Sequence, residues 1–249
     1  MFIMNGRIGD FLLSMGIKVY HKMEKLTEKE LKAQEVYTNK LDIVLRKTKK
    51  PLIIGIVGLI GSGKSTIAKE LASLIGATVV SGDDIRICLR KEKEKYDNTR
   101  LIAENIAEAK IGMGGNVIID SDFIDQKKRV SLKEKAKKVG AKVIFIRTYA
   151  DLDVVIGRIM DADYENIPED FFGGASSSYQ GKNKGAVVKE REMICRWLSH
   201  YNAVNIGNGR YKFELKKLPF KVFAEIDTTN ENKWKQEVKM IAGQIRSYY

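Results

Sequence analysis

The stretch Gly58-Leu59-Ile60-Gly61-Ser62-Gly63-Lys64-Ser65 decides the fold of this chain, because it reads G-x-x-x-x-G-K-S, the pattern of a phosphate-binding loop, or P-loop. The apolar run Leu52–Val57 before it is typical of a buried parallel strand, and the pattern Ser65–Ile75 after it is typical of a helix. Strand, glycine-rich turn and helix are the setting in which this motif is specific. An ordinary glycine-rich turn is the alternative, and the flanking pattern disfavours it.

The motif predicts how the loop holds a nucleotide. Glycines let the backbone come close to phosphate oxygens, and the N–H groups of the loop and of the following helix start then point at the anion. We expect Lys64 to bridge the terminal phosphates as a point charge and Ser65 to hold Mg²⁺ through its hydroxyl. The predicted ligands are ATP, which the sequence does not distinguish from GTP, and Mg²⁺. The predicted nucleotide contacts are Gly58, Gly61, Ser62, Gly63, Lys64, Ser65 and Thr66.

Length and composition limit the class of protein. The chain has 249 residues, enough for one α/β domain with an appendage, and its 44% apolar content is that of a globular protein. Its two cysteines, Cys88 and Cys195, do not make a disulfide framework, which favours a reducing, cytoplasmic setting. The longest apolar run is too short to cross a bilayer, and charged residues interrupt residues 1–20, so we expect neither a membrane span nor a signal peptide.

The net charge of +12 has two interpretations. It can indicate a polyanionic partner such as RNA or DNA. It can also reflect lysine-rich solvated faces, because much of the lysine alternates with glutamate, as in Lys91–Lys95 and Lys133–Lys138. Charge alone leaves a nucleic-acid partner open, and oligomeric state is not readable from the sequence.

Residues 1–49 form a predicted helical extension ahead of a P-loop domain at residues 50–249. Thr27 and Glu30 have capping-box spacing, and apolar positions recur on one face, which predicts a helix from Glu28 to Arg46. A shorter helix is predicted over Ile8–Lys22. The extension carries no recognisable chemistry, so it either packs against the domain or contacts a partner.

Strand and helix patterns alternate through the rest of the chain. This alternation predicts an α/β fold of the P-loop NTPase class, with a five-stranded, mainly parallel sheet and helices on both faces. Residues 161–187, rich in glycine, serine and charge, read as a lid, or alternatively as a long surface loop. Further strands are predicted over Ala77–Ser81, Asn116–Ser121, Lys142–Arg147, Tyr211–Leu215 and Phe220–Asp227, and further helices over Asn98–Met113, Asp125–Val139, Ala150–Met160, Val188–Tyr201 and Glu231–Tyr248.

Polar side chains stand at the predicted carboxyl ends of the parallel strands, where such sheets bind ligands. They are Asp83, Asp120 and Arg147, together with the P-loop, and we expect them to share one site. Asp83 can take a proton from an acceptor hydroxyl, and Arg86, one turn further on, can grip a phosphate. Asp120 ends an apolar strand, as the carboxylate that orients Mg²⁺ does in P-loop proteins. Helix capping is the alternative role for each of these aspartates.

The P-loop together with Ser81-Gly82-Asp83-Asp84-Ile85-Arg86 resembles the P-loop kinases related to phage polynucleotide 5′-hydroxyl kinase. In that family a D-x-x-R follows the second strand; its Asp activates the acceptor hydroxyl and its Arg contacts the acceptor phosphate. The resemblance therefore implies these catalytic roles for Asp83 and Arg86. The same layout is similar to zeta-toxin-type sugar-nucleotide kinases, adenylylsulfate kinases and small-molecule phosphotransferases.

The resemblance extends over roughly Pro51–Met160 and places Arg158 at the first lid arginine of the family. A second lid arginine shortly after it is missing. Lys182, Lys184 and Arg191 are the candidate substitutes.

Three functions remain open at this stage. The first is an ATP-dependent kinase that phosphorylates a hydroxyl, such as the 5′ end of a nucleic acid. The second is a kinase of a nucleoside, nucleotide, sugar nucleotide or other small metabolite. The third is a non-catalytic, nucleotide-gated binding protein, which the pair Asp83 and Arg86 disfavours because a pure switch needs no acceptor base.

Overall fold

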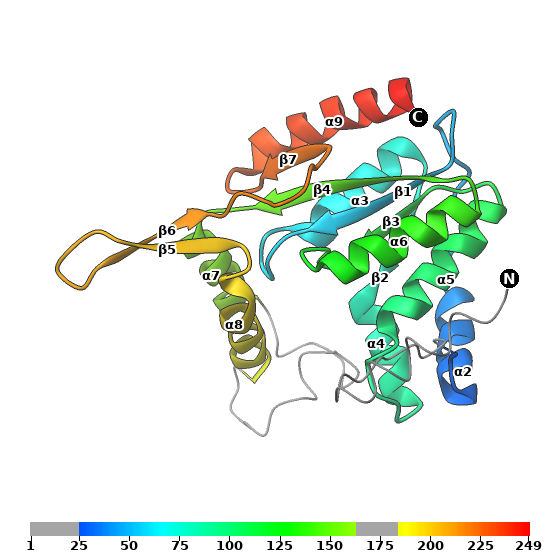
Figure 1. Ribbon diagram of the computed structural model, residues 1–249, viewed down its shortest axis with the longest axis horizontal. Helices are drawn as coiled ribbons and strands as arrows, with labels where there is room; N and C mark the ends of the chain where they lie inside the picture. The colour runs from blue at the N-terminus through cyan, green and yellow to red at the C-terminus, as the bar shows by residue number, and fades with distance from the viewer. Residues whose placement is uncertain (1–24, 163–183) are drawn as a thin grey trace, which may run out of the picture.

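The computed structural model describes residues 25–162 and 184–249, which build a parallel sheet covered by helices on both faces (Figure 1). The sheet order is β2-β3-β1-β4-β7, and every neighbouring pair is parallel. The strands are β1 (Leu52–Val57), β2 (Thr78–Ser81), β3 (Val117–Asp120), β4 (Lys142–Tyr149) and β7 (Ala224–Asp227). The predicted five-stranded α/β fold is confirmed.

Four of the predicted helices are confirmed, whereas the helix over residues 82–91 was not predicted. The predicted helices over 98–113, 125–139, 150–160 and 231–248 are confirmed to within two residues at each end. The helices are α2 (Glu28–Thr38), α3 (Lys64–Ile75), α4 (Gly82–Lys91), α5 (Thr99–Gly112), α6 (Gln126–Lys138), α7 (Leu152–Met160), α8 (Lys184–Trp197) and α9 (Glu231–Tyr248).

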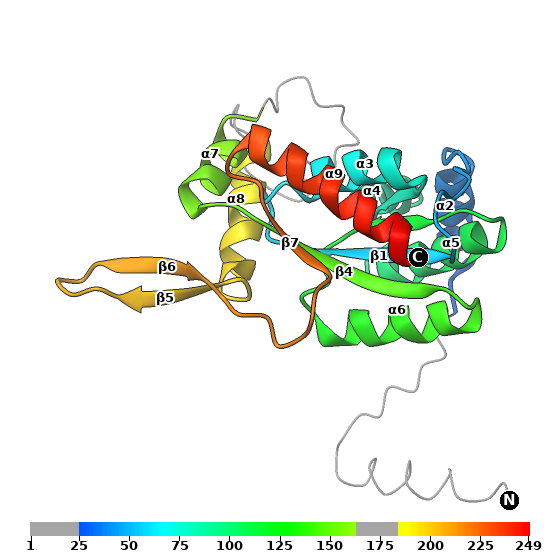
Figure 2. The ribbon, with the colours of Figure 1, turned by 90° about the horizontal axis from the view of Figure 1, so that it is seen from above.

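Two apolar cores lie on opposite faces of the sheet. One joins the sheet to α3 and α9, through Ile67 and Leu71 on one helix and Val238 and Ile245 on the other. The other core receives buried side chains from α2, α4, α5 and α6. Figure 2 shows α3 and α9 on one side of the strands and α6 on the other. Because β1 is central and covered on both faces, all six of its residues are buried, as its continuous apolar run predicts.

The helix α2 is shorter than predicted and buries a different face. It ends at Thr38 rather than Arg46, because the backbone beyond it bonds to other elements: Arg46 N donates to Gly114 O, and Lys47 N donates to Ile75 O. The predicted capping box at Thr27 is present. Leu31 is half exposed, whereas Tyr37 is buried and its hydroxyl accepts a hydrogen bond from Ser81 N (2.7 Å). The helix therefore packs mainly against α4 and reaches the carboxyl end of β2 through Tyr37.

The strand β4 runs two residues further than predicted, to Tyr149. Arg147 consequently does not stand at the carboxyl end of a strand. Its side chain is 2% exposed and donates to Glu225 Oε1 and to the carbonyl oxygen of His200, both at 3.4 Å. The prediction that Arg147 joins the P-loop site is wrong, because an inward position in the longer strand buries it beneath the segment that follows α8.

The region after α7 departs most from prediction. Residues 163–183, most of the predicted lid, and the predicted helix over residues 8–22 lie outside the described residues. The helix α8 begins at Lys184 and ends at Trp197, so the predicted range 188–201 is displaced toward the amino terminus. Residues 201–205 instead form β5, which pairs antiparallel with the predicted strand β6 (Tyr211–Leu215). This hairpin projects from the end of the molecule that carries α7 and α8 (Figures 1 and 2).

The last strand is also shorter than predicted, because only Ala224–Asp227 pair with β4. Both cysteines are free, in agreement with the absence of a disulfide framework from the sequence. Within the described part of the chain, no helix combines the length and the apolar character that a bilayer span requires.

Candidate active site

The P-loop adopts a conformation that its glycines permit. Gly61 and Gly63 both have φ of +82°, in the left-handed region that other residues rarely enter. A Cβ on Gly58 would lie 2.4 Å from Thr148 Oγ1 and 2.5 Å from Ser62 Oγ, so only glycine fits there. The loop leads directly into α3, whose first residue is Lys64. The amino terminus of α3 therefore faces the site with unpaired N–H groups, as phosphate binding requires.

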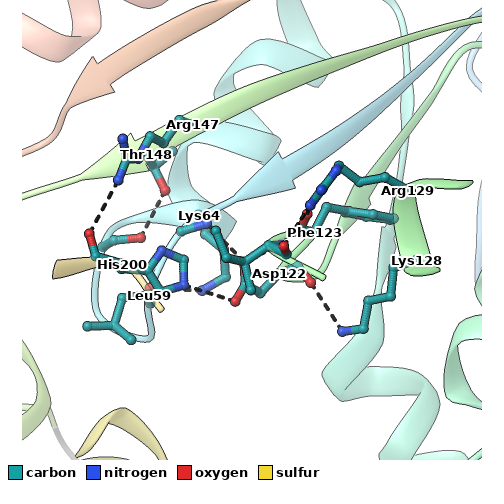
Figure 3. Close-up of polar contacts among 12 residues, drawn as sticks. Leu59, Lys64, Asp122, Phe123, Lys128, Arg129, Arg147, Thr148 and His200 are labelled. Carbon is teal, nitrogen blue, oxygen red and sulfur yellow. Dashed lines mark hydrogen bonds and ion pairs between the residues drawn. The ribbon is translucent and has the colours of Figure 1, made fainter. Parts of the chain in front are cut away.

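The ammonium group of Lys64 folds over the loop and donates to Leu59 O (3.0 Å; Figure 3). Burial lowers its pKa, and the nearby carboxylates of Asp122, Asp120 and Asp83 oppose that shift. These three carboxylates favour the charged form of Lys64, beside the loop where phosphate charge would accumulate.

Ser65 and Asp120 meet at the start of α3. The Ser65 hydroxyl hydrogen-bonds to the Asp120 carboxylate, at the carboxyl end of β3. Burial raises the pKa of Asp120, and this hydrogen bond and Lys64 work against the rise. A hydroxyl and a carboxylate beside a phosphate cradle are the groups that hold Mg²⁺ in nucleotide sites. Among the described residues, no group of three or more His, Cys, Asp or Glu side chains is arranged to hold a metal ion.

Asp83 and Arg86 lie on the first turns of α4, and neither residue caps this helix. Ser81 Oγ accepts from Asp84 N (3.2 Å), so Ser81 caps the helix and leaves Asp83 for another role. Asp83 is half exposed and pairs with Arg86 NH1 at 2.7 Å and with Lys189 Nζ at 3.6 Å. Burial alone raises the pKa of Asp83, but Lys189 and Arg86 outweigh it and hold the pKa below its ordinary value.

These groups line one cavity of about 740 Å³ between the P-loop, α4 and α8. It brings together most of the predicted site residues, including Lys64, Asp83, Arg86 and Arg158. Asp83 therefore faces the same space as Lys64, from across the cleft. The remaining lining residues are Gly58, Ile60, Gly61, Gly63, Ser65, Thr66, Tyr96, Ser81, Asp120, Ser121, Asp122, Ala162, Lys189, Glu192 and Arg196.

The helix α8 contributes side chains that the sequence analysis missed. Lys189, Glu192 and Arg196 line the cavity, whereas the candidate Arg191 does not. Residues 189, 192 and 196 recur at helical spacing and share one face, which was the available signal. It could not be used without knowing which face of α8 turns toward α4. Of the other two candidates, Lys182 lies outside the described residues and Lys184 is the first residue of α8.

Arg158 lies against the outer side of the P-loop, close to the strand β7 and the start of α9. Its guanidinium donates to Gly61 O (3.3 Å) and to both the hydroxyl (2.9 Å) and the carbonyl oxygen of Thr228. Beside it lies a second, smaller cavity of about 250 Å³ next to the predicted contact Thr66, lined also by Gly63, Ile67, Thr228, Glu231 and Trp234. Arg158 borders both cavities.

Asp122 is a further carboxylate at this site, two residues beyond Asp120. It is 8% exposed, and its Oδ1 accepts from Gly58 N (3.3 Å) and from Ile124 N (3.1 Å). Its Oδ2 pairs with His200 Nε2 at 3.0 Å. Asp122 thus supports the loop from beneath, while Asp120 meets Ser65.

Comparison with known proteins supports the nucleotide-binding fold. A family model described as an AAA domain matches residues 53–165. The chain resembles the crystal structure of a putative kinase from Chloroflexus aurantiacus, with a TM-score of 0.52 and 16% identity over 81% of this chain and 100% of that one. It also resembles the crystal structure of a protein called APE1195, with a TM-score of 0.52 and 19% identity over 80% and 97% of the two chains. At these identities the likeness concerns the fold, which is that of a P-loop NTPase.

Curated relatives exist among mycobacterial proteins. Uncharacterized proteins of Mycobacterium tuberculosis and Mycobacterium bovis are 30% identical over a segment that covers 40% of this chain. The chain spans about a quarter of the length of these relatives (23%). The matched segment is 116 residues long.

Proposed function

We propose that the protein is an ATP-dependent kinase that transfers the γ-phosphate to a hydroxyl of an acceptor carrying its own anionic group. The observation that carries this proposal is the position of Asp83, across one cavity from Lys64 and paired with Arg86 and Lys189. A nucleotide-gated switch needs the P-loop alone. A carboxylate and cations facing the loop from the other wall are the parts that phosphoryl transfer adds.

The donor nucleotide lies along the P-loop in this proposal. Its β- and γ-phosphates accept from the loop N–H groups and from Lys64, which exchanges its bond to Leu59 O for phosphate oxygens. Mg²⁺ at Ser65 and Asp120 supplies charge neutralisation when bound. The smaller cavity beside Thr66 and Trp234 continues from the loop on the other side of Arg158 and accommodates the far end of the nucleotide.

The acceptor enters from the side of α4 and α8. Asp83 has a pKa below its ordinary value, so it is ionised near neutral pH and can accept the hydroxyl proton as the new phosphate ester forms. Arg86, Lys189 and Arg196 surround that position with positive charge, opposed by Glu192. Arginine forks and lysine ammonium groups are the usual ligands of phosphate, which favours a phosphorylated acceptor, whether mononucleotide, sugar nucleotide or nucleic acid 5′ end.

The test is phosphate transfer from γ-labelled ATP to a panel of acceptors: 5′-hydroxyl oligonucleotides, nucleotides, nucleosides, sugar nucleotides and sugars. We expect labelling of acceptors that already carry an anionic group, and weak or no labelling of their uncharged counterparts. An Asp83→Asn variant should bind ATP with unchanged affinity and lose transfer by about 10²–10⁴-fold.

Two results would contradict the proposal. Transfer by the Asp83→Asn variant at the wild-type rate would remove the base assignment. Equal rates with a nucleoside and its monophosphate would remove the anionic acceptor, while leaving the kinase assignment intact. Labelling confined to oligonucleotides would identify a nucleic-acid acceptor.

A further inference from the structure

A buried hydrogen-bonded pair, His200 and Asp122, lies at the cavity, which Asp122 also lines. His200 is 2% exposed and Asp122 is 8% exposed, and His200 Nε2 and Asp122 Oδ2 lie 3.0 Å apart (Figure 3). The two residues are 78 positions apart in the sequence. An ionised carboxylate only accepts hydrogen bonds, so the proton between them is held on Nε2.

The Asp122 end of the pair is attached to the P-loop. Its Oδ1 accepts from the N–H of Gly58, the first residue of the loop, and from Ile124 N. The carboxylate therefore joins the first residue of the P-loop to His200.

The His200 end is attached to α8 and to the hairpin. The backbone N–H of His200 donates to Trp197 O (2.8 Å) at the end of α8. Its carbonyl oxygen accepts from Lys216 N (2.7 Å), next to β6, and from Arg147 (3.4 Å). His200 therefore lies just beyond the carboxyl end of α8, the helix that carries Lys189 and Arg196.

We propose that His200 is a positioning residue, and that its hydrogen bond to Asp122 couples the acceptor-side cations of α8 to the backbone of the phosphate-binding loop. The chain of contacts runs from Gly58 N through Asp122 and His200 to the carboxyl end of α8. Nucleotide binding that reorients Gly58 is transmitted to Lys189 and Arg196, and movement of α8 is transmitted back to the loop. The hydrogen bond between His200 and Asp122 thus connects the side of the cavity that would bind the acceptor to the loop that would bind ATP. Its consequence for catalysis rests on the proposed kinase function.

Hydrogen-bond geometry provides a sharp test, because glutamine and asparagine mimic different ring nitrogens. A glutamine side-chain amide reaches the position of Nε2, whereas that of asparagine reaches only Nδ1. His200→Gln should therefore keep the bond to Asp122, and His200→Asn should lose it although its amide has the same polarity. Tyr201→Phe is a matched control, because it removes a neighbouring buried hydrogen bond, from Tyr201 Oη to Ala150 O (2.7 Å), that does not involve Asp122.

The coupling is measured by hydrogen–deuterium exchange with and without Mg²⁺ and a non-hydrolysable ATP analogue, on peptides covering residues 56–62 and 189–200. We expect the analogue to protect the α8 peptide in the wild type, in His200→Gln and in Tyr201→Phe, and to leave it unprotected in His200→Asn. Affinity for the analogue should fall about tenfold in His200→Asn alone. Thermal unfolding of all variants identifies loss from misfolding.

Equal protection of the α8 peptide in His200→Asn and the wild type would overturn the proposal. So would equal losses in the asparagine and glutamine variants, which would make the effect one of packing. Both readouts are taken without an acceptor, so they remain decisive if no acceptor in the panel is phosphorylated. Conversely, a positive panel with no exchange difference would leave the kinase function and refute the coupling.

Discussion

The donor and acceptor halves of this site are built in different ways. The donor half is one continuous stretch, Gly58–Ser65, between a buried strand and the helix it starts. The acceptor half collects Asp83 and Arg86 from α4 and Lys189 and Arg196 from α8, more than a hundred residues further along the chain. A phosphate cradle needs backbone N–H groups, which local conformation can arrange, whereas an acceptor pocket needs side chains that only packing can bring together.

The largest expected effect is on the donor half. Lys64→Ala should lower turnover of ATP by at least about 10²–10³-fold, because the ammonium group that neutralises the terminal phosphates is lost. Lys69→Ala, on the exposed side of the same helix, is the control and should behave as the wild type. Steady-state phosphate transfer and ATP hydrolysis measure both variants, and substantial turnover by Lys64→Ala would break the comparison at its donor side.

Arg196→Gln should weaken the acceptor half alone. We expect the KM for the acceptor to rise about ten- to a hundredfold, because a charge-assisted hydrogen bond to the acceptor is lost. The affinity for ATP should not change. Arg191→Gln is a matched control on the same helix, because Arg191 is exposed and does not line the cavity. Equal KM values in the two variants would show that α8 does not contact the acceptor.

Lys189→Met should change the pH dependence of transfer. Asp83 must be ionised to accept a proton, and Lys189 is the main charge that holds its pKa down against burial. Without Lys189 the pKa of Asp83 rises, so the acidic limb of the kcat/KM profile should move to higher pH. Profiles of kcat/KM against pH at constant ionic strength test this shift. An unmoved acidic limb in Lys189→Met would show that ionisation of Asp83 does not control the rate.

The smallest expected effect is that of a residue distant in sequence, Thr228, on ATP binding by the donor half. Thr228, from the loop after β7, is 2% exposed, accepts from Arg158 and donates to Ser62 O (3.1 Å). Thr228→Val should weaken ATP binding about fivefold, the equivalent of about 1 kcal/mol for one hydrogen bond. Thr229→Val, whose hydroxyl instead accepts from Asp151 N, should leave ATP affinity unchanged. Equilibrium binding of a fluorescent ATP analogue measures both.

The accuracy of sequence-based prediction differed between elements for physical reasons. The strand β1 and the helix α9 were predictable, since a continuous buried run and a clear apolar face each have one favourable structure. The end of α2 was not, because Leu45 continues the helical pattern but its segment forms a bridge with Gly115 instead. Likewise, Arg147 looked like a site residue, but β4 continues past it and pairs with β7 up to Tyr149.

The amino-acid sequence alone predicted the P-loop, the strands of the parallel sheet, and the pair Asp83 and Arg86, because each depends on neighbours within a few residues or on a hydrophobic period. Only the tertiary structure decided that Lys189 and Arg196 face Asp83, that Arg191 does not, and that His200 reaches Asp122. Which face of a helix turns inward, and which buried polar groups meet, depends on the free energy of packing the whole chain. Local patterns hold no record of that sum.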